Sequence, residues 1–248
     1  ASAAIDNAAR KIAWGRVANA GQVCVAPDYV LVHESVFEGF VQALGSAMTQ
    51  MYNGDGAGFD RSPELMRIIN DQHFGRVARL LQDARDKGAR FAFGGETRAA
   101  ERFVAPTVLT GVTEDMLIMQ EEIFAPVLPV ISYADRREAL AIIERRTKPL
   151  ALYIYARDRG AIDYFLAHTT AGSTVVNHNL IQSGTNPRLP FGGVNHSGIG
   201  RVGGETGFME MSNPRSVVEQ PLGLLDLTFN LPPYSKTYRK LIEKALKA

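Results

Sequence analysis

A nearly continuous apolar run, Leu-Ala-Leu-Tyr-Ile-Tyr-Ala at residues 150–156, constrains the fold of this chain more than any other feature. A strand that is apolar on both faces is typical of a parallel sheet covered by helices, because a strand with one solvated face alternates apolar and polar residues. A helix-like segment follows at 158–168, and a second β-rich segment follows at 173–177. This order predicts an α/β protein with an open, mostly parallel sheet flanked by helices.

The alternation of helices and strands extends along the rest of the chain. Ser35, with Glu38 three residues later, is typical of a capped helix start and predicts a helix to about residue 52. Residues 182–207 are rich in Gly, Pro, Asn and Ser, which favours a long ordered or functional loop. Sequence patterns predict further helices at 5–20, 63–70, 71–87, 134–146 and 235–247, and further strands at 29–33, 91–93, 107–112, 127–133 and 215–220.

Charge and composition exclude several classes of function. The 27 basic and 26 acidic residues leave a net charge of +1, which gives no basis for a nucleic-acid or membrane partner. No apolar run approaches the roughly 18 residues that a membrane-spanning helix needs. The single cysteine excludes an internal disulfide, and the five scattered histidines predict no metal site. A lone thiol is typical of a reducing compartment, so we expect a cytoplasmic protein.

The single cysteine, Cys24, is the first candidate for chemistry. It lies in Asn-Ala-Gly-Gln-Val-Cys-Val-Ala-Pro-Asp at residues 19–28, between a predicted helix and a predicted strand. Gly21 allows a close backbone approach and Pro27 ends any helical continuation, so we expect the thiol on a tight loop. A thiolate there is a nucleophile if its surroundings stabilise it or a base lies close by. The alternative is a buried structural cysteine, which the spacing alone favours.

Three motifs in order give Cys24 a context. Residues 19–32 closely resemble the cysteine motif of the aldehyde dehydrogenase superfamily, and within them the run 26–32 is similar to the branch of the class 3 and coniferyl aldehyde dehydrogenases. Gln-Glu-Glu-Ile-Phe-Ala-Pro at 120–126 resembles the family's Glu-Glu-Ile-Phe-Gly-Pro motif. Leu-Pro-Phe-Gly-Gly-Val at 189–194 and Ser-Gly-Ile-Gly-Arg at 197–201 resemble its Pro-Phe-Gly-Gly and Ser-Gly-Xaa-Gly segment. The resemblance covers most of the chain and implies the family's catalytic-domain fold.

The resemblance also implies a role for five residues. Cys24 is the nucleophile, Glu122 binds the ribose hydroxyls of NAD or NADP, and Phe124 packs against the nicotinamide. Phe191 lines the substrate entrance, and Asn177 borders the active site. Without the motifs, Glu122 reads as a solvated carboxylate and Phe124 as a core aromatic residue. A turn-forming role for Asn177 at the end of its strand is an equal alternative.

Three positions depart from the family pattern. Ala125 stands where the family usually has Gly, and its methyl group is expected to narrow the turn without abolishing cofactor binding. Asn195 and His196 stand where small residues are more common. Separately, Gly-Ile-Gly-Arg-Val-Gly at 198–203 satisfies a dinucleotide-binding pattern, but it follows a loop instead of a buried strand. We therefore reject this segment as a cofactor-binding fingerprint.

The resemblance divides the chain into three parts. Residues 1–20 are the end of the cofactor-domain or linking helix, residues 21–214 are the catalytic domain, and residues 215–248 are an oligomerisation strand with a C-terminal tail. The family's general-base Glu, its oxyanion-stabilising Asn and its dinucleotide-binding domain are expected to precede Ala1. A homodimer is the expected assembly of the natural enzyme.

The expected function is NAD(P)-dependent oxidation of an aldehyde to its carboxylic acid through a cysteine thiohemiacetal and thioester. The branch suggests an aromatic substrate such as coniferyl aldehyde, or a medium-chain aliphatic aldehyde. The segment alone is expected to be inactive. The alternatives are a non-catalytic dimerising domain, a fragment made for structural study, or a cysteine hydrolase. A hydrolase needs a His base close to Cys24, and no local signature supports one.

Overall fold

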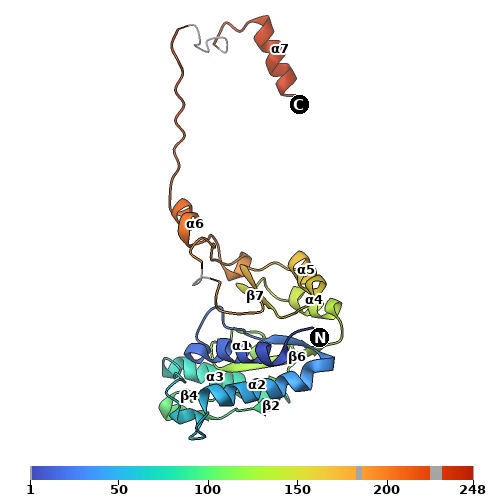
Figure 1. Cartoon of the computed structure of the whole chain (residues 1–248). Coiled ribbons are helices and arrows are strands. Elements are labelled where there is room, and N and C mark those ends of the chain that lie inside the picture. Colours follow the sequence, from blue (N-terminus) through green and yellow to red (C-terminus); the bar gives the residue numbers. More distant parts are fainter. Residues whose placement is uncertain (1, 183–185, 224–230, 248) are drawn as a thin grey trace. The chain divides into compact units, whose positions relative to one another are not determined.

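The computed structural model describes residues 2–182, 186–223 and 231–247. The chain forms two compact units, Ala1–Met211 and Ser212–Ala248, which are described separately (Figure 1). The first unit contains all of the strands in the described residues and every site residue predicted from the sequence.

A four-stranded sheet is the centre of the first unit. Its strands are β1 (Val30–His33), β6 (Val127–Tyr133), β5 (Thr107–Thr110) and β2 (Arg90–Phe93), in the order β1-β6-β5-β2. The first three are parallel and β2 is antiparallel at one edge, so the predicted mostly parallel sheet is confirmed. All four residues of β5 are buried, which is typical of a strand covered on both faces.

Helices cover this sheet, as the strand order predicts. α1 (Ile5–Val17) packs against α2 (Phe37–Tyr52), and Ile12, Leu44 and Met48 belong to their shared apolar cluster. α3 (Asp71–Asp86) contributes Leu80 to a second cluster that also holds Leu109 of β5. Figure 1 shows these three helices around the sheet. Shorter elements complete the unit: the two-stranded sheet of β3 (Thr97–Arg98) and β4 (Phe103–Val104), then α4 (Arg136–Glu144) and the short helix α6 (Gly204–Glu210).

A separate parallel pair contains the apolar run at 150–156. β7 (Ala151–Ile154) pairs with β8 (Ser173–Val176), and α5 (Arg159–His168) connects them. Only Ile154 of β7 is buried and the other three residues are half-buried. The expectation of burial on both faces is therefore wrong for this strand, because its sheet has only two strands in the described residues.

Two predicted helix features are also wrong. Residues 63–70 form turns and irregular chain, and the N–H of the buried Ile68 donates to the carbonyl of Arg102 at 3.1 Å instead of to a helix. The second concerns Ser35, which does not cap α2. It lies in the 3₁₀ helix η2 (Glu34–Val36), where its own N–H donates to Nδ1 of His33 at 3.2 Å. A tertiary contact and a neighbouring imidazole thus override the local pattern.

The second unit contains α7 (Lys236–Ala245), which confirms the helix predicted at 235–247, and Ser235 is its N-cap. The strand predicted at 215–220 is absent: these residues are exposed, irregular chain in the structure. The predicted strand was expected to pair with a second chain. The role of this segment in oligomerisation therefore stays a prediction. Within the described residues, no helix combines the length and apolar character needed to span a membrane.

Candidate active site

Cys24 lies on an exposed turn between the 3₁₀ helix η1 (Ala18–Gly21) and β1. The turn is closed by the N–H of Ala26, which donates to the carbonyl of Val23 at 2.9 Å. Its far side is held by Tyr153, whose hydroxyl donates to the carbonyl of Val25 at 2.7 Å. Burial raises the pKa of Tyr153, so this phenol remains protonated and able to donate. The thiol is therefore accessible on an anchored loop, as the sequence predicts.

The chain reaches this turn through three consecutive residues in the left-handed region. Asn19, Ala20 and Gly21 have φ values of 50°, 53° and 72°. A side chain at Gly21 would place its Cβ 2.5 Å from the carbonyl carbon of Ala125 and 2.9 Å from the oxygen of Arg16. Glycine is thus required where the cysteine loop meets the Glu-Glu-Ile-Phe segment.

Two arginines of α3 hold the Glu-Glu-Ile-Phe segment in place. Arg76 donates to the carbonyls of Glu122 and Ile123, at 2.8 and 2.6 Å. Arg79 lies 2.8 Å from both carboxylate oxygens of Glu121. The arrangement uses the carboxylate of Glu121 and only the backbone of Glu122.

The carboxylate of Glu122 consequently remains available. Its side chain is exposed and makes no hydrogen bond or ion pair among the described residues. Desolvation raises the pKa of this carboxyl group, and the neighbouring Asp28 carboxylate adds to the effect. Phe124 is half-buried, with a left-handed φ of 47° that redirects the chain directly after the motif. Such strained conformations persist where surrounding structure imposes them, often at functional sites.

Asn177 follows β8, and its side chain is occupied by backbone groups. Its amide donates to the carbonyl of Ala156 at 3.0 Å and accepts from the N–H of Ala156 at 3.0 Å. Its own carbonyl accepts from Lys11 at 2.7 Å, and its φ is 58°. These contacts favour the turn-forming alternative over direct contact with a substrate.

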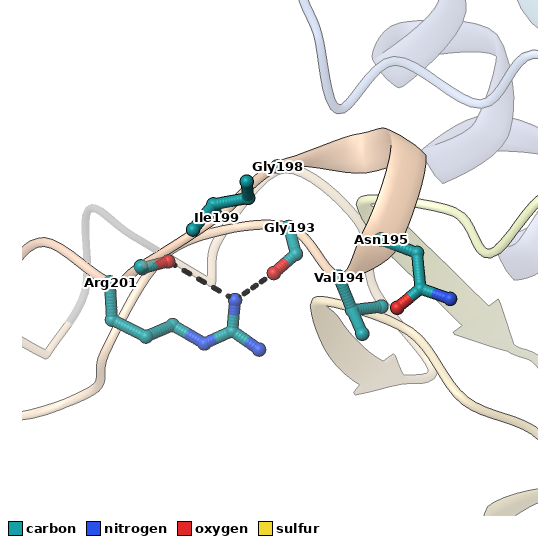
Figure 2. Close-up of a pocket in the computed structure, with 7 residues that line it drawn as sticks. Gly193, Val194, Asn195, Gly198, Ile199 and Arg201 are labelled. Atoms are coloured by element: carbon teal, nitrogen blue, oxygen red, sulfur yellow. Dashed lines mark hydrogen bonds between the residues drawn. The ribbon is translucent and has the colours of Figure 1, made fainter.

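Phe191 begins a glycine-rich loop that is folded back on itself. Its N–H and carbonyl exchange two hydrogen bonds of 2.8 Å with Val202. Figure 2 shows how the guanidinium of Arg201 then joins the carbonyls of Gly193 and Gly200 across the loop. The loop backbone is closely packed, because a Cβ at Gly193 would overlap the backbone of the Ser-Gly-Xaa-Gly segment.

One cleft of about 1000 Å³ brings part of the predicted site together. Cys24 and Glu122 both line it, as does Tyr153. Phe124, Asn177 and Phe191, in contrast, are not among its lining residues. His196 lines the cleft too. Even so, no histidine in the described part of the chain hydrogen-bonds to Cys24, so the hydrolase alternative gains no support.

Comparison with known proteins shows which family this chain belongs to. Residues 1–217 match the aldehyde dehydrogenase family. The chain belongs to the aldehyde dehydrogenase family. It is 41% identical over 239 residues to aldehyde dehydrogenase family 3 member B3 of Mus musculus, a match over 96% of this chain and 48% of the mouse protein. It is 38% identical over 218 residues to the dimeric NADP-preferring aldehyde dehydrogenase of Bos taurus, which covers 88% of this chain and 87% of the bovine one.

A solved structure agrees with this assignment. The substrate-bound state of Staphylococcus aureus AldH is similar over 99% of this chain and 52% of its own, with a TM-score of 0.88 and 38% identity. The chain spans about half the length of several relatives that it matches. The match to a family 3 member confirms the class 3 resemblance of the cysteine motif.

In this chain, Ala125 replaces a usual glycine without strain. It is fully buried, and its φ lies outside the left-handed region that Phe124 occupies. The site also includes two residues that sequence reasoning missed, Arg16 and Tyr153. Arg16 lies four residues after Ile12 on the buried side of α1, and this position on the apolar stripe was the signal available.

Proposed function

We propose that the full-length protein is an NAD(P)-dependent aldehyde dehydrogenase with Cys24 as its nucleophile. The observation that carries the proposal is that the exposed thiol of Cys24 and the available carboxylate of Glu122 line one cleft. A nucleophile and a cofactor-binding carboxylate beside one cavity suit covalent oxidation of a small carbonyl compound.

The chemistry begins at the thiolate of Cys24, which attacks the aldehyde carbon to form a carbon–sulfur bond. The former carbonyl oxygen becomes a thiohemiacetal oxyanion and needs a donor. The N–H of Cys24 is the donor that we propose for this role, because it makes no hydrogen bond among the described residues. When bound, oxidised NAD(P) would be the oxidant that accepts a hydride from the former aldehyde carbon. Water then cleaves the thioester, releasing the acid and returning the thiol.

The residues of this chain fit part of a dinucleotide. The carboxylate of Glu122 is free to accept from two ribose hydroxyls at once. Phe124 is half-buried and lies two residues after Glu122, so we propose that its ring packs against the nicotinamide. The bovine relative is named NADP-preferring, and relatives of both cofactor types leave NAD and NADP as alternatives.

The substrate that we propose is an aromatic aldehyde such as coniferyl aldehyde, or a medium-chain aliphatic aldehyde. The class 3 and coniferyl character of the cysteine motif supports this choice. We also propose that the 248-residue segment alone does not turn over, because it matches about half of several relatives and catalytic groups act together. A single exposed thiol suits the reducing cytoplasm.

Glu122→Gln tests the function and the cofactor role together. In the full-length enzyme, assayed with a panel of these aldehydes and each cofactor, the variant is expected to raise the KM for NAD(P) about tenfold, because a charged acceptor is lost. Glu121→Gln is the matched control, since the Glu121 carboxylate is already held by Arg79. Wild-type protein that reduces neither cofactor with any aldehyde contradicts the function. Equal KM values for Glu122→Gln and wild type contradict only the role of Glu122.

The assembly that we propose is a homodimer. The exposed segment 215–220, with its adjacent β-branched valines, suits strand pairing with a second chain, and the bovine relative is named dimeric. Light scattering on the full-length enzyme across a concentration series is expected to give a dimer. A monomer at every concentration or a stable tetramer contradicts it. A dimer without any aldehyde oxidation instead favours a non-catalytic dimerising domain.

A further inference from the structure

A buried arginine joins the two loops that carry the proposed chemistry. Arg16 lies in the last turn of α1 and is only 1% exposed. Its guanidinium contacts main-chain oxygens of two segments that are about a hundred residues apart in sequence, as the separations of 11 and 109 residues show. A basic residue in the last turn of a helix usually interacts with that helix's own terminal carbonyl groups. Arg16 instead contacts carbonyl groups of two other segments.

The first set of contacts reaches the Glu-Glu-Ile-Phe segment. Nε of Arg16 donates to the carbonyl of Ala125 at 2.7 Å, and one Nη donates to the same oxygen. Ala125 lies three residues after Glu122 and adjoins the left-handed Phe124. The guanidinium therefore fixes the chain immediately beyond the proposed cofactor residues.

The second set reaches the cysteine turn. The other Nη of Arg16 donates to the carbonyl of Pro27 at 2.9 Å and to Oδ1 of Asp28 at 3.1 Å. The same carboxylate oxygen accepts from the N–H of Ile123 at 3.1 Å. Asp28, four residues after Cys24, thus connects the two segments a second time, at the residue that follows Glu122.

Burying this charge is costly, which argues for a specific role. Desolvation lowers the pKa of Arg16, and the ion pair with Asp28 opposes that effect only partly. A well-packed apolar side chain of similar volume is often at least as stable as a buried ion pair. Lysine cannot replace the contacts either, because its ammonium lacks the planar fork that reaches both loops.

We propose that Arg16 is a positioning residue that sets the cysteine turn against the Glu122 segment. It would thereby set the separation between the carbon bonded to Cys24 and a cofactor whose ribose Glu122 would hold. This inference rests on the proposed function, because it assigns the geometry that the same reaction requires.

The test uses full-length enzyme carrying Arg16→Met or Arg16→Lys. Misplacement by about 1 Å can lower a rate about 100-fold, so we expect kcat to fall about 100-fold in Arg16→Met and about tenfold in Arg16→Lys. Hydride transfer then becomes rate-limiting, and the deuterium isotope effect on kcat with the aldehyde-deuterated substrate rises above the wild-type value. The KM for NAD(P) changes less than kcat, because Glu122 itself is retained.

Leu44→Ala is the control for lost stability. Leu44 is fully buried in the α1–α2 cluster and touches neither loop in the hydrogen-bond network. Well below its melting temperature, this variant is expected to keep kcat within about twofold, because its cavity lowers the stability of the core and leaves the contacts between the two loops in place. If the wild type is active and Arg16→Met has the same kcat and isotope effect as the wild type, the positioning role alone is overturned. It is also overturned if Leu44→Ala loses as much kcat as Arg16→Met. Inactive wild type overturns the proposed function and this inference with it.

Discussion

Replacing Cys24 by alanine is expected to abolish aldehyde oxidation by the full-length enzyme, by at least about a thousandfold, because no other thiol in this chain can form the covalent intermediate. The fold should survive the change. Cys24 is exposed on a turn, so alanine leaves no cavity, and the free energy of unfolding should change by less than about 0.5 kcal/mol. The measurement is aldehyde-dependent NAD(P)H formation, with thermal unfolding recorded on the same sample.

Alkylation gives an independent reading of the same thiol. In folded wild type, iodoacetamide is expected to modify the Cys24 peptide without denaturant, because the side chain is exposed. Val23→Ala changes the same turn but keeps the thiol, so it separates loss of the nucleophile from disturbance of the loop. Modification only after unfolding would support a structural cysteine, and activity of Cys24→Ala within tenfold of wild type would exclude it as the nucleophile.

The sheet was predictable where strands are buried on both faces. The bounds of β6 agree with the prediction. Its short apolar run does not have the three- and four-residue spacing of an amphipathic helix, so a strand was the favoured interpretation. Residues 63–70 failed for the opposite reason. Their helix-like composition is local, whereas the hydrogen bond from Ile68 to Arg102 is tertiary and carries no signal in a single sequence.

The sequence predicted which residues form the candidate site, but it predicted only part of how they are arranged. The motifs identified Cys24 and Glu122, and the structure places both beside one cleft. Sequence reasoning did not place Asn177, because nothing in its spacing shows that Ala156 occupies both ends of its amide. Arg16 was missed since a charge near a helix end normally reaches solvent, and its burial depends on carbonyls far away in sequence.

The contact between the two loops leads to the second large effect, on stability. Gly21→Ala adds a methyl group at a φ of 72°, against the carbonyl of Ala125 and 2.9 Å from the oxygen of Arg16. A left-handed alanine costs about 1 kcal/mol. Forcing an atom into packed backbone costs about 1–3 kcal/mol more. We therefore expect Gly21→Ala to lower the free energy of unfolding by about 2–4 kcal/mol, measured by urea denaturation.

Gly56→Ala separates the two causes of that loss. Gly56 has the same φ of 72°, but a Cβ there would meet nothing within 4 Å. Its replacement should therefore cost only the left-handed conformation, about 1 kcal/mol. If both variants lose the same stability, the close approach of the cysteine loop to Ala125 is not what requires glycine. If Gly21→Ala lowers the free energy of unfolding more than Gly56→Ala does, and its Cys24 alkylation rate also changes, the packing of these two loops determines both the stability of the fold and the placement of the thiol.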